Sequence, residues 1–246
     1  MREFFIGIGG GVLIGATGAG AGSLITPLLI LVGHSAAGSV ATGVATMFVS
    51  KLSGSIVHRR LGHWPGSAAW FVISGGVAGS LAVWAVFAAL PWRLEVSDAL
   101  LRGIVGVTLL GSAAATTLAS RRELPTAPVL PCRALLFAAG FAVGPLVALT
   151  SAGSGSILVP LLLLLTAWRV PELAATSNWF GLVAGGVASL FHLRLHTLDM
   201  RLFAIVAAGV LPGVVAGALL SRVVSRQWLT YVIYVLTLFL AAVLLS

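Results

Sequence analysis

Two short stretches of small and hydroxyl-bearing residues carry the side chains best suited to bind a ligand. They span residues 17–27 and 150–160, and each ends in a proline inside a long apolar run. Aligning the two prolines also pairs Thr17 with Thr150, Gly20 with Gly153, Gly22 with Gly155 and Ser23 with Ser156. Glycine and proline both disfavour a continuous helix. The pattern therefore predicts a break in a helix at each stretch.

A break of this kind is suited to hold an anion. The half-helix that follows it begins with free N–H groups, and the helix dipole there favours negative charge. The predicted substrate-binding residues in the two stretches are Thr17, Gly20, Gly22, Ser23, Thr26, Thr150, Ser151, Gly153, Ser154, Gly155 and Ser156. The alternative is that small residues only let two helices pack closely, which needs no ligand. We assign this packing role to Gly7, Gly11, Gly15, Gly140 and Gly144.

Two further residues are candidates for the same site. Lys51 is the only lysine in the chain and lies inside an apolar segment, where a charged residue is costly and points to function. It could neutralise an anion in transit, or its ammonium could reach the membrane surface along its flexible stem. Asn178 lies about one turn inside a later segment and offers an amide donor.

The acidic residues exclude some substrates by their positions. None of the six lies in the middle of an apolar run; they are Glu3, Glu95, Asp98, Glu123, Glu172 and Asp199. Cation transporters and proton pumps usually place a carboxylate at membrane depth. The sequence therefore favours an anionic or neutral substrate.

Two histidines recur at equivalent segment ends, His58 and His192. Because histidine titrates near neutral pH, the pair could form a proton-linked gate. The competing interpretation, which we favour, is that each caps a helix end at the membrane interface. A nucleophilic pair of Ser154 or Ser156 with His192 would instead indicate an intramembrane serine protease. The duplication of the whole pattern argues against this, since one catalytic pair is enough.

The composition places the chain in a membrane. Hydrophobic residues make up 59% of it and charged residues only 8%, far from the balance of a water-soluble domain. We predict an all-α polytopic protein with about eight membrane segments, at 4–32, 36–58, 67–90, 99–119, 133–165, 171–192, 201–221 and 227–245. The first and fifth are too long for one straight crossing, and a break inside each accommodates the excess.

The positive net charge does not indicate nucleic acid as a partner, because nearly all arginines lie between the apolar runs, where basic residues orient membrane proteins. The single Cys132 excludes an intrachain disulfide and a multi-cysteine metal site. No phosphate-binding loop of the Gly-Lys-Ser/Thr type is present. We therefore expect neither a metal nor another cofactor.

The chain divides into two related halves, 1–120 and 133–246, joined by a charged, proline-containing linker at 121–132. Past the glycine-rich stretches the match continues with a one-residue slip. It pairs Ala41-Thr42 with Ala175-Thr176, Ser55 with Ser189, His58 with His192, Arg60 with Arg194, Gly75 with Gly209 and Gly79 with Gly213. An internal repeat in a membrane protein indicates a transporter with its site between the halves.

The relation between the halves depends on the first and fifth segments. If both cross the membrane, each half has four crossings and the halves are parallel. If both are re-entrant hairpins, each half has an odd number and the repeat is inverted. With eight crossings the arginines favour a cytoplasmic N-terminus, and this is the orientation we expect. The re-entrant arrangement has its N-terminus outside and gives a similar imbalance.

These residues together resemble a known family. The stretch ending in Ser23-Leu24-Ile25-Thr26-Pro27, the following Ala41-Thr42-Gly43, the segment end at 55–62 and the repeat of all three after residue 133 are similar to the sulfite exporter family TauE/SafE. The resemblance implies a multi-pass protein of a bacterial-type inner membrane with two homologous halves. It also implies a small sulfur-containing anion as substrate, sulfite or an organosulfonate, which is usually exported.

The anion argument from the residues agrees with that implication. We therefore predict secondary or facilitated transport, with an anion-selective, channel-like pore as the alternative and the protease as a remote one. The expected partners are the small anion and the lipid bilayer, and faces of small residues make a homodimer plausible.

Overall fold

The chain folds into a bundle of helices, seen here in a computed structural model that describes residues 1–17, 22–60, 62, 64–89, 97–121, 132–220, 224 and 226–245. Within these residues there are ten helices and no strands. They are α1 (Arg2–Thr17), α2 (Gly22–Leu31), α3 (Ala36–Arg60), α4 (Ala69–Ala89), α5 (Asp98–Ser120), α6 (Arg133–Thr150), α7 (Leu158–Leu165), α8 (Val170–Arg194), α9 (Met200–Leu220) and α10 (Arg226–Leu245). The all-helical prediction is confirmed.

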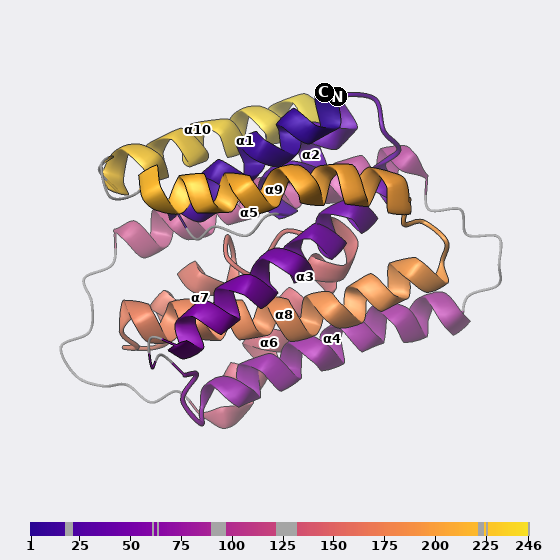
Figure 1. The fold of residues 1–246 in the computed structure, drawn as a ribbon. Coiled ribbons are helices and arrows are strands. Elements are labelled where there is room, and N and C mark those ends of the chain that lie inside the picture. Colours follow the sequence, from indigo (N-terminus) through magenta and orange to yellow (C-terminus); the bar gives the residue numbers. More distant parts are fainter. Residues whose placement is uncertain are drawn as a thin grey trace.

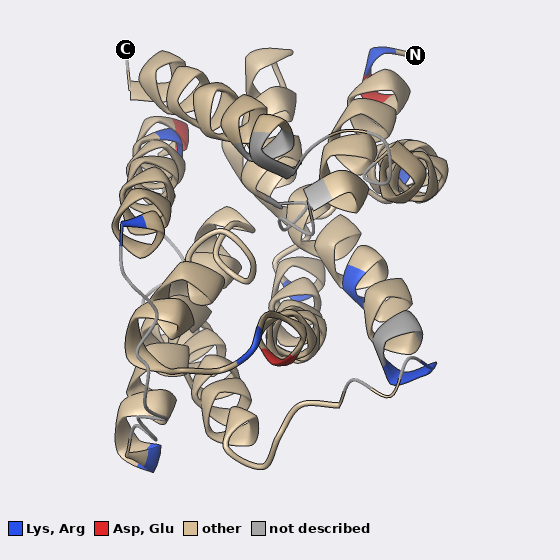
Figure 2. Ribbon diagram, turned by 90° about the vertical axis from the view of Figure 1, so that its left-hand side faces the viewer, with Lys and Arg blue, Asp and Glu red and all other residues tan. Residues whose placement is uncertain are grey.

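The helices are long and apolar, as a bilayer requires. Among the described residues, five helices are long and apolar enough to cross a membrane, namely α4, α5, α6, α8 and α9. Charged residues lie mostly at helix ends, with long uncharged stretches between them (Figure 2). The described helices agree with six of the predicted segments to within two residues at each end.

The other two predicted segments, 4–32 and 133–165, each contain two helices. In the second, α6 ends where Ser151 adopts a left-handed conformation with φ 59°, and its N–H donates to the carbonyl of Val147 at 2.9 Å. Gly153 follows with φ +136°, a value that L side chains rarely adopt. The predicted break is therefore present here. In the first segment α1 ends at Thr17 and α2 begins at Gly22, and Gly20 lies outside the described residues.

Each of these segments reverses direction. His34, just past α2, lies 3.6 Å from the carboxylate of Glu3 at the start of α1, so α2 returns toward the end where α1 began. The start of α4 lies beside the start of α6, shown by Phe71 with Arg133. Helix α4 also runs in the same direction as α8, shown by Trp70 with Trp179 and Phe87 with Phe191. Since α7 leads into α8 through residues 166–169, it must also turn back along α6. Both segments are antiparallel hairpins, because glycine-rich backbone can reverse where a helix cannot.

Close crossings attach each hairpin to a helix from the other part of the chain. Helix α1 packs along α9, and α6 packs along α4. A Cβ atom added to Gly11 would lie 2.6 Å from the carbonyl oxygen of Val210, and one added to Gly144 would lie 2.4 Å from that of Gly76. Gly7, Gly15 and Gly140 make the same kind of approach to backbone atoms. The packing role predicted for these five glycines is therefore confirmed.

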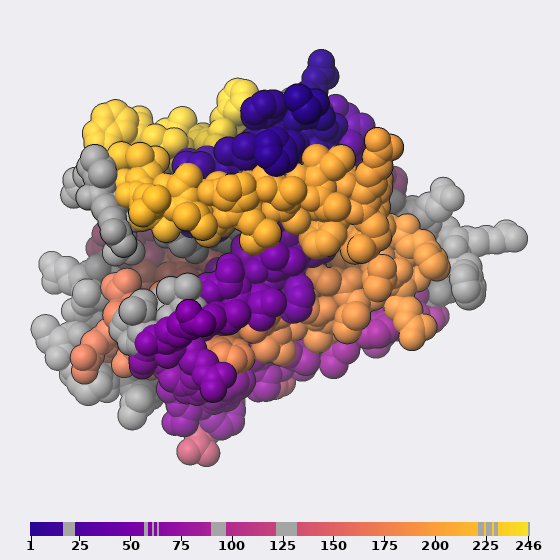
Figure 3. All heavy atoms as spheres, in the orientation of Figure 1, coloured from indigo at the N-terminus to yellow at the C-terminus, as the bar shows by residue number. Residues whose placement is uncertain are grey.

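Helices α3 and α8 cross at the centre of the bundle, and α5 pairs with α10. Figure 1 shows α3 running obliquely between an upper group that includes α1, α9 and α10 and a lower group that includes α4, α6 and α8. On the face shown in Figure 3, α9 and α3 lie side by side. Two clusters of buried apolar side chains fill the interior, one around Phe180 and Leu158 and the other around Leu24 and Leu109.

The bundle has two distinct ends. Both chain termini lie at one end (Figure 1), which we call the terminal end; it also holds the starts of α3, α5 and α9. The opposite end holds the end of α3 and the starts of α4, α6, α8 and α10. We call it the arginine-rich end, because its described residues include Arg59, Arg60, Arg121, Arg133, Arg169 and Arg226.

The glycine crossings should be essential for stability in a position-specific way. Replacing Gly11 by Ala should destabilise the protein by about 1–3 kcal/mol, because the added methyl group meets backbone that cannot move aside. Gly9, in the same helix, has no atom within 4 Å of an added Cβ. Its replacement by Ala should be neutral or slightly stabilising. Thermal melts of the two variants in detergent check this, and equal melting temperatures would contradict the close α1–α9 contact.

Candidate functional site

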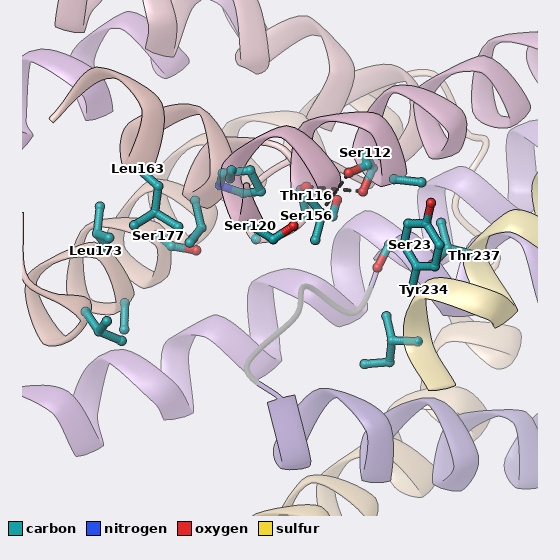
Figure 4. A pocket seen from close by; sticks show the side chains of 18 of the residues that line it. Ser23, Ser112, Thr116, Ser120, Ser156, Leu163, Leu173, Ser177, Tyr234 and Thr237 are labelled. Carbon is teal, nitrogen blue, oxygen red and sulfur yellow. Dashed lines mark hydrogen bonds between the residues drawn. The ribbon is translucent and has the colours of Figure 1, made fainter. Parts of the chain in front are cut away.

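A cavity of about 480 Å³ opens among α5, α7, α8 and α10, and its lining reaches the last residue of α5 and the first residue of α8. Ser23 from α2 and Lys51 from α3 complete its lining. Its polar wall consists mainly of hydroxyl groups that come together from several helices, as Figure 4 shows for Ser23, Ser112, Thr116, Ser156, Tyr234 and Thr237. The remaining wall is apolar. Five predicted site residues line this cavity, namely Ser23, Lys51, Gly155, Ser156 and Asn178.

Lys51 is the one described cation away from a helix end, and it is almost completely buried, with 4% of its surface exposed. Within the described residues no carboxylate lies within ion-pair distance of its ammonium, and no hydrogen bond to it is found. A buried, unpaired charge costs several kcal/mol. The aliphatic stem of Lys51 packs against Gly181 and is held in place there. A Cβ atom added to Gly181 would lie only 3.0 Å from Lys51 Cγ. The snorkelling alternative does not fit this burial.

Ser156 supplies unused donors next to the cavity. Its Oγ is buried and has no hydrogen-bond partner. The backbone N–H groups of Gly155 and Ser156 lie in the turn before α7 and donate to no acceptor in the described part of the chain. Buried polar groups are nearly always paired in folded proteins. A hydroxyl and two amides without acceptors at a cavity are therefore a reason to expect a ligand that accepts hydrogen bonds.

Helices α5 and α10 contribute cavity residues that sequence reasoning missed. Ser112, Thr116 and Ser120 lie at four-residue intervals along one face of α5, and Tyr234 and Thr237 face them from α10. The Ser112 hydroxyl donates to the Ser156 carbonyl at 3.1 Å, which fixes α5 to the second hairpin. The four-residue spacing of hydroxyls in an apolar run was the available signal. It predicts a polar stripe on a helix, although it does not say what the stripe faces.

The other predicted residues of the second stretch lie behind the cavity wall. Ser154 is fully buried; its hydroxyl donates to Met47 Sδ at 3.3 Å and its carbonyl accepts from Ser177 Oγ at 2.6 Å. Thr150 Oγ accepts the N–H of Ala152 at 3.2 Å inside the turn. Neither residue lines the cavity, and the same is true of Gly153 and Ser151. They shape the broken backbone and hold it against α3 and α8.

Thr26 and Ser151 meet at the contact between the two hairpins. Their hydroxyls are hydrogen-bonded to each other, and both side chains are buried. Gly43 on α3 faces this pair so closely that a Cβ atom there would overlap both hydroxyls. Thr26 therefore connects the hairpins and is not among the residues lining the cavity.

The rest of the first stretch borders the gap between α1 and α2. Thr17 ends α1 and Gly22 begins α2, but their side chains and the whole of Gly20 lie outside the described residues. His58 lies in α3, and its side chain is also outside them.

His192 binds other parts of the protein with both ring nitrogens. Its Nε2 is 2.8 Å from the Ala148 carbonyl and its Nδ1 is 3.0 Å from Thr197 Oγ. The ring thus connects the end of α8 to α6 just before the break. No hydrogen bond joins the ring to Ser154, whose hydroxyl donates to Met47 Sδ, or to Ser156, whose hydroxyl has no partner. The described geometry does not provide the nucleophilic pair of a serine protease.

The cavity therefore combines one cation, several hydroxyl donors and free amides inside a bundle of apolar helices. Among the described residues that line it, by contrast, none is acidic. A site with these donors attracts a small anion with oxygen acceptors, because charge-assisted hydrogen bonds are stronger than neutral ones. Its position beside a broken helix is where membrane transporters bind their substrates.

Comparison with known proteins agrees with this architecture. A family model described as "Sulfite exporter TauE/SafE" matches residues 4–244. The chain belongs to this family of multi-pass membrane transporters, and the predicted resemblance is confirmed. It is also 25% identical over 229 residues to "Probable membrane transporter protein YjnA" of Bacillus subtilis (strain 168), with 90% of each chain covered. Members of such transporter families are generally not enzymes.

Two serines of the cavity wall should respond differently to removal of the hydroxyl. Ser177→Ala should lower stability by about 1 kcal/mol, because the buried carbonyl of Ser154 loses its donor. Ser156→Ala should leave stability unchanged or raise it, because it removes an unpaired buried hydroxyl. Thermal melts of both variants without added anion measure the difference. A comparable loss in Ser156→Ala would show that its hydroxyl is already paired within the protein.

Proposed function

We propose that this protein transports a small sulfur-containing anion, sulfite or an organosulfonate, which binds in the cavity at Lys51. The observation that carries the proposal is the buried ammonium of Lys51, which lacks a counter-charge among the described residues. An anion beside it would remove most of the cost of burying that charge. The family to which the chain belongs supports sulfur oxyanions as the class of substrate.

The surrounding donors suit an oxyanion. Ser156 Oγ and the N–H groups of Gly155 and Ser156 can each donate to an oxygen atom, and the Asn178 amide lies on the same lining. A sulfonate or sulfite group has three oxygens that accept several donors at once. A metal or organic cation would instead face an ammonium and hydroxyls without any carboxylate from the lining.

We further propose that the two halves form an inverted repeat. If α1–α5 correspond in order to α6–α10, the contact between α1 and α9 corresponds to the contact between α6 and α4. The contacts α3–α8 and α5–α10 each join two corresponding helices, so each of these pairs corresponds to itself. Each half then contains five helices that alternate in direction, so the second half begins from the opposite end of the bundle. This supports the re-entrant alternative over parallel halves of four crossings. Inverted repeats commonly create a site near the middle of the membrane.

The antiparallel hairpins also change the orientation that the arginines favour. Of the described arginines, six lie at the arginine-rich end, and four, Arg2, Arg102, Arg194 and Arg201, lie at the terminal end. Since cytoplasmic loops carry the excess of basic residues, we propose that both termini face away from the cytoplasm. This replaces the cytoplasmic N-terminus expected from eight straight crossings.

The direction of transport follows from charge and potential. A membrane potential that is negative inside favours anion exit by about 2.3 kcal/mol per charge per 100 mV. Export then needs no ATP, and alternating exposure of the cavity by movement of one bundle part against the other provides the mechanism. A channel-like pore would use the same residues, but its flux would rise linearly with concentration.

Replacing Lys51 should abolish transport without unfolding the protein. In liposomes, Lys51→Met should reduce uptake of radiolabelled sulfite at least tenfold, since the charge that offsets the anion is gone. Ser156→Leu, which fills the donor site, should have a similar effect. Ser53→Ala, on the same helix but outside the cavity lining, serves as the control. Unchanged flux in Lys51→Met would refute the proposed site, and flux that does not saturate would favour the channel.

The proposed orientation predicts a C-terminus outside the cytoplasm. Alkaline phosphatase fused after residue 246 should be active in intact bacterial cells, whereas green fluorescent protein at the same place should not fluoresce. The opposite pair of signals would restore the cytoplasmic orientation of both termini, and the cavity site would be unaffected by that result.

A further inference from the structure

A second hollow lies on the outside of the bundle, away from the transport cavity. It has a volume of about 960 Å³ and lies between the first turns of α4 and α6 at the arginine-rich end. Ser67, Trp70, Phe71 and Ser74 line it from the α4 side, and Arg133 and Leu136 line it from α6. The proposed transport mechanism does not use this groove, which we call the α4–α6 groove.

The shape of the groove follows from the glycine crossing described above. The backbones of α4 and α6 already meet at Val72, since a Cβ atom added to Gly140 would overlap the Val72 carbonyl. Nearer the starts of the two helices, the side chains of Phe71 and Arg133 lie against each other at the groove. Buried Ile73 and Leu136 form the inner wall, while Ser67, Trp70 and Ser74 are exposed.

The groove carries one positive charge without a carboxylate partner. Arg133 is exposed, and its guanidinium lies 5.3 Å from the centre of the Phe71 ring. Within the described residues no carboxylate is close enough to pair with it. This cation–π contact fixes the guanidinium at the groove and leaves its outer N–H groups available. Arg133 is also the first residue of α6, so the dipole of that helix adds positive potential.

The corresponding crossing at the terminal end has a different charge. There α1 packs along α9 in the same way, but Glu3 lies at the start of α1 and pairs with the N-terminal ammonium at 3.1 Å. The carboxylate of Glu3 thus offsets positive charge at the start of α1, whereas Arg133 at the start of α6 has no carboxylate partner among the described residues. Trp70 also lines the α4–α6 groove, and tryptophan beside a basic residue is typical of the headgroup level of a membrane.

The groove continues into the surface that faces lipid. Phe137 and Phe141, exposed residues further along α6, stack on each other with ring centroids 6.3 Å apart and are 39% and 42% exposed. A bound molecule with its charged group at Arg133 would thus have an apolar surface of α6 beside its tail. A free inorganic anion would leave that surface unused.

We propose that the α4–α6 groove binds an anionic phospholipid, with the headgroup phosphate at Arg133 and Ser67 and an acyl chain along Phe137 and Phe141. This site goes beyond the proposed transport function and does not depend on it. Basic pockets between membrane helices are suited to anionic headgroups, whose phosphate accepts hydrogen bonds from a guanidinium in a fork geometry.

The test compares lipids on the purified full-length protein. In detergent, phosphatidylglycerol should raise the melting temperature more than phosphatidylcholine of the same chain length, and native mass spectrometry should show phosphatidylglycerol retained. Arg133→Gln should weaken that retention about fivefold, the effect of one arginine near an anionic headgroup. Ser74→Trp, which fills the groove, should weaken it as well. Arg201→Gln, an exposed arginine at the start of α9, should leave it unchanged.

Three outcomes would overturn the proposal. Equal retention of both lipids, or retention by Arg133→Gln equal to that of the unmodified protein, would show that the groove does not select an anionic lipid. Stabilisation by inorganic phosphate alone that is lost in Arg133→Gln would show a site for a soluble anion. Sulfite transport by Arg133→Gln is measured in parallel, so that failure of the lipid site and failure of the transport site are recognised separately.

Discussion

The structure depends on the requirement that no polar backbone group be exposed to the hydrocarbon interior of a membrane. Non-helical chain at that depth is tolerated only where protein surrounds it or water reaches it. Residues 151–154 meet this requirement, because all four are buried and Ser177 donates to the buried carbonyl of Ser154. The turn that follows, at Gly155 and Ser156, opens instead onto the cavity. In one part of the break the polar groups are hydrogen-bonded within the protein and stabilise the fold. In the other part, hydrogen-bond donors have no partner in the protein and are available to a ligand.

The sequence predicts much of this arrangement, because its strongest signals are physical constraints on single segments. Hydropathy locates the helices, since a segment crossing a bilayer must be apolar over a fixed length. Glycine and serine within such a run locate the second break, and the isolation of Lys51 among apolar residues identifies it as unusual. Each of these inferences needs only the neighbours of a residue along the chain, and each agrees with the described helices and cavity lining.

Other features depend on contacts between distant segments, and local signals do not contain them. Hydropathy has no direction, so the return of α2 and α7 along α1 and α6 could not be separated from straight crossings. A hydroxyl in a helix has the same sequence signature whether it faces a cavity, as Thr116 does, or another side chain, as Thr26 does. This is why the stripe on α5 was missed, and why the hydrogen bond between Thr26 and Ser151 was not predicted.

The glycine crossings also determine which parts of the molecule can travel as rigid bodies. Helix α1 is pressed against α9, and α6 against α4, with backbone atoms in direct contact. Each hairpin is therefore attached to a helix that lies on the other side of the 121–132 connection. Any hinge that divided the protein at that connection would have to pull these surfaces apart. The boundaries between moving parts must lie elsewhere, along looser contacts such as those that α2, α7 and the α5–α10 pair make with the other helices. Each moving part therefore contains helices from both halves of the chain.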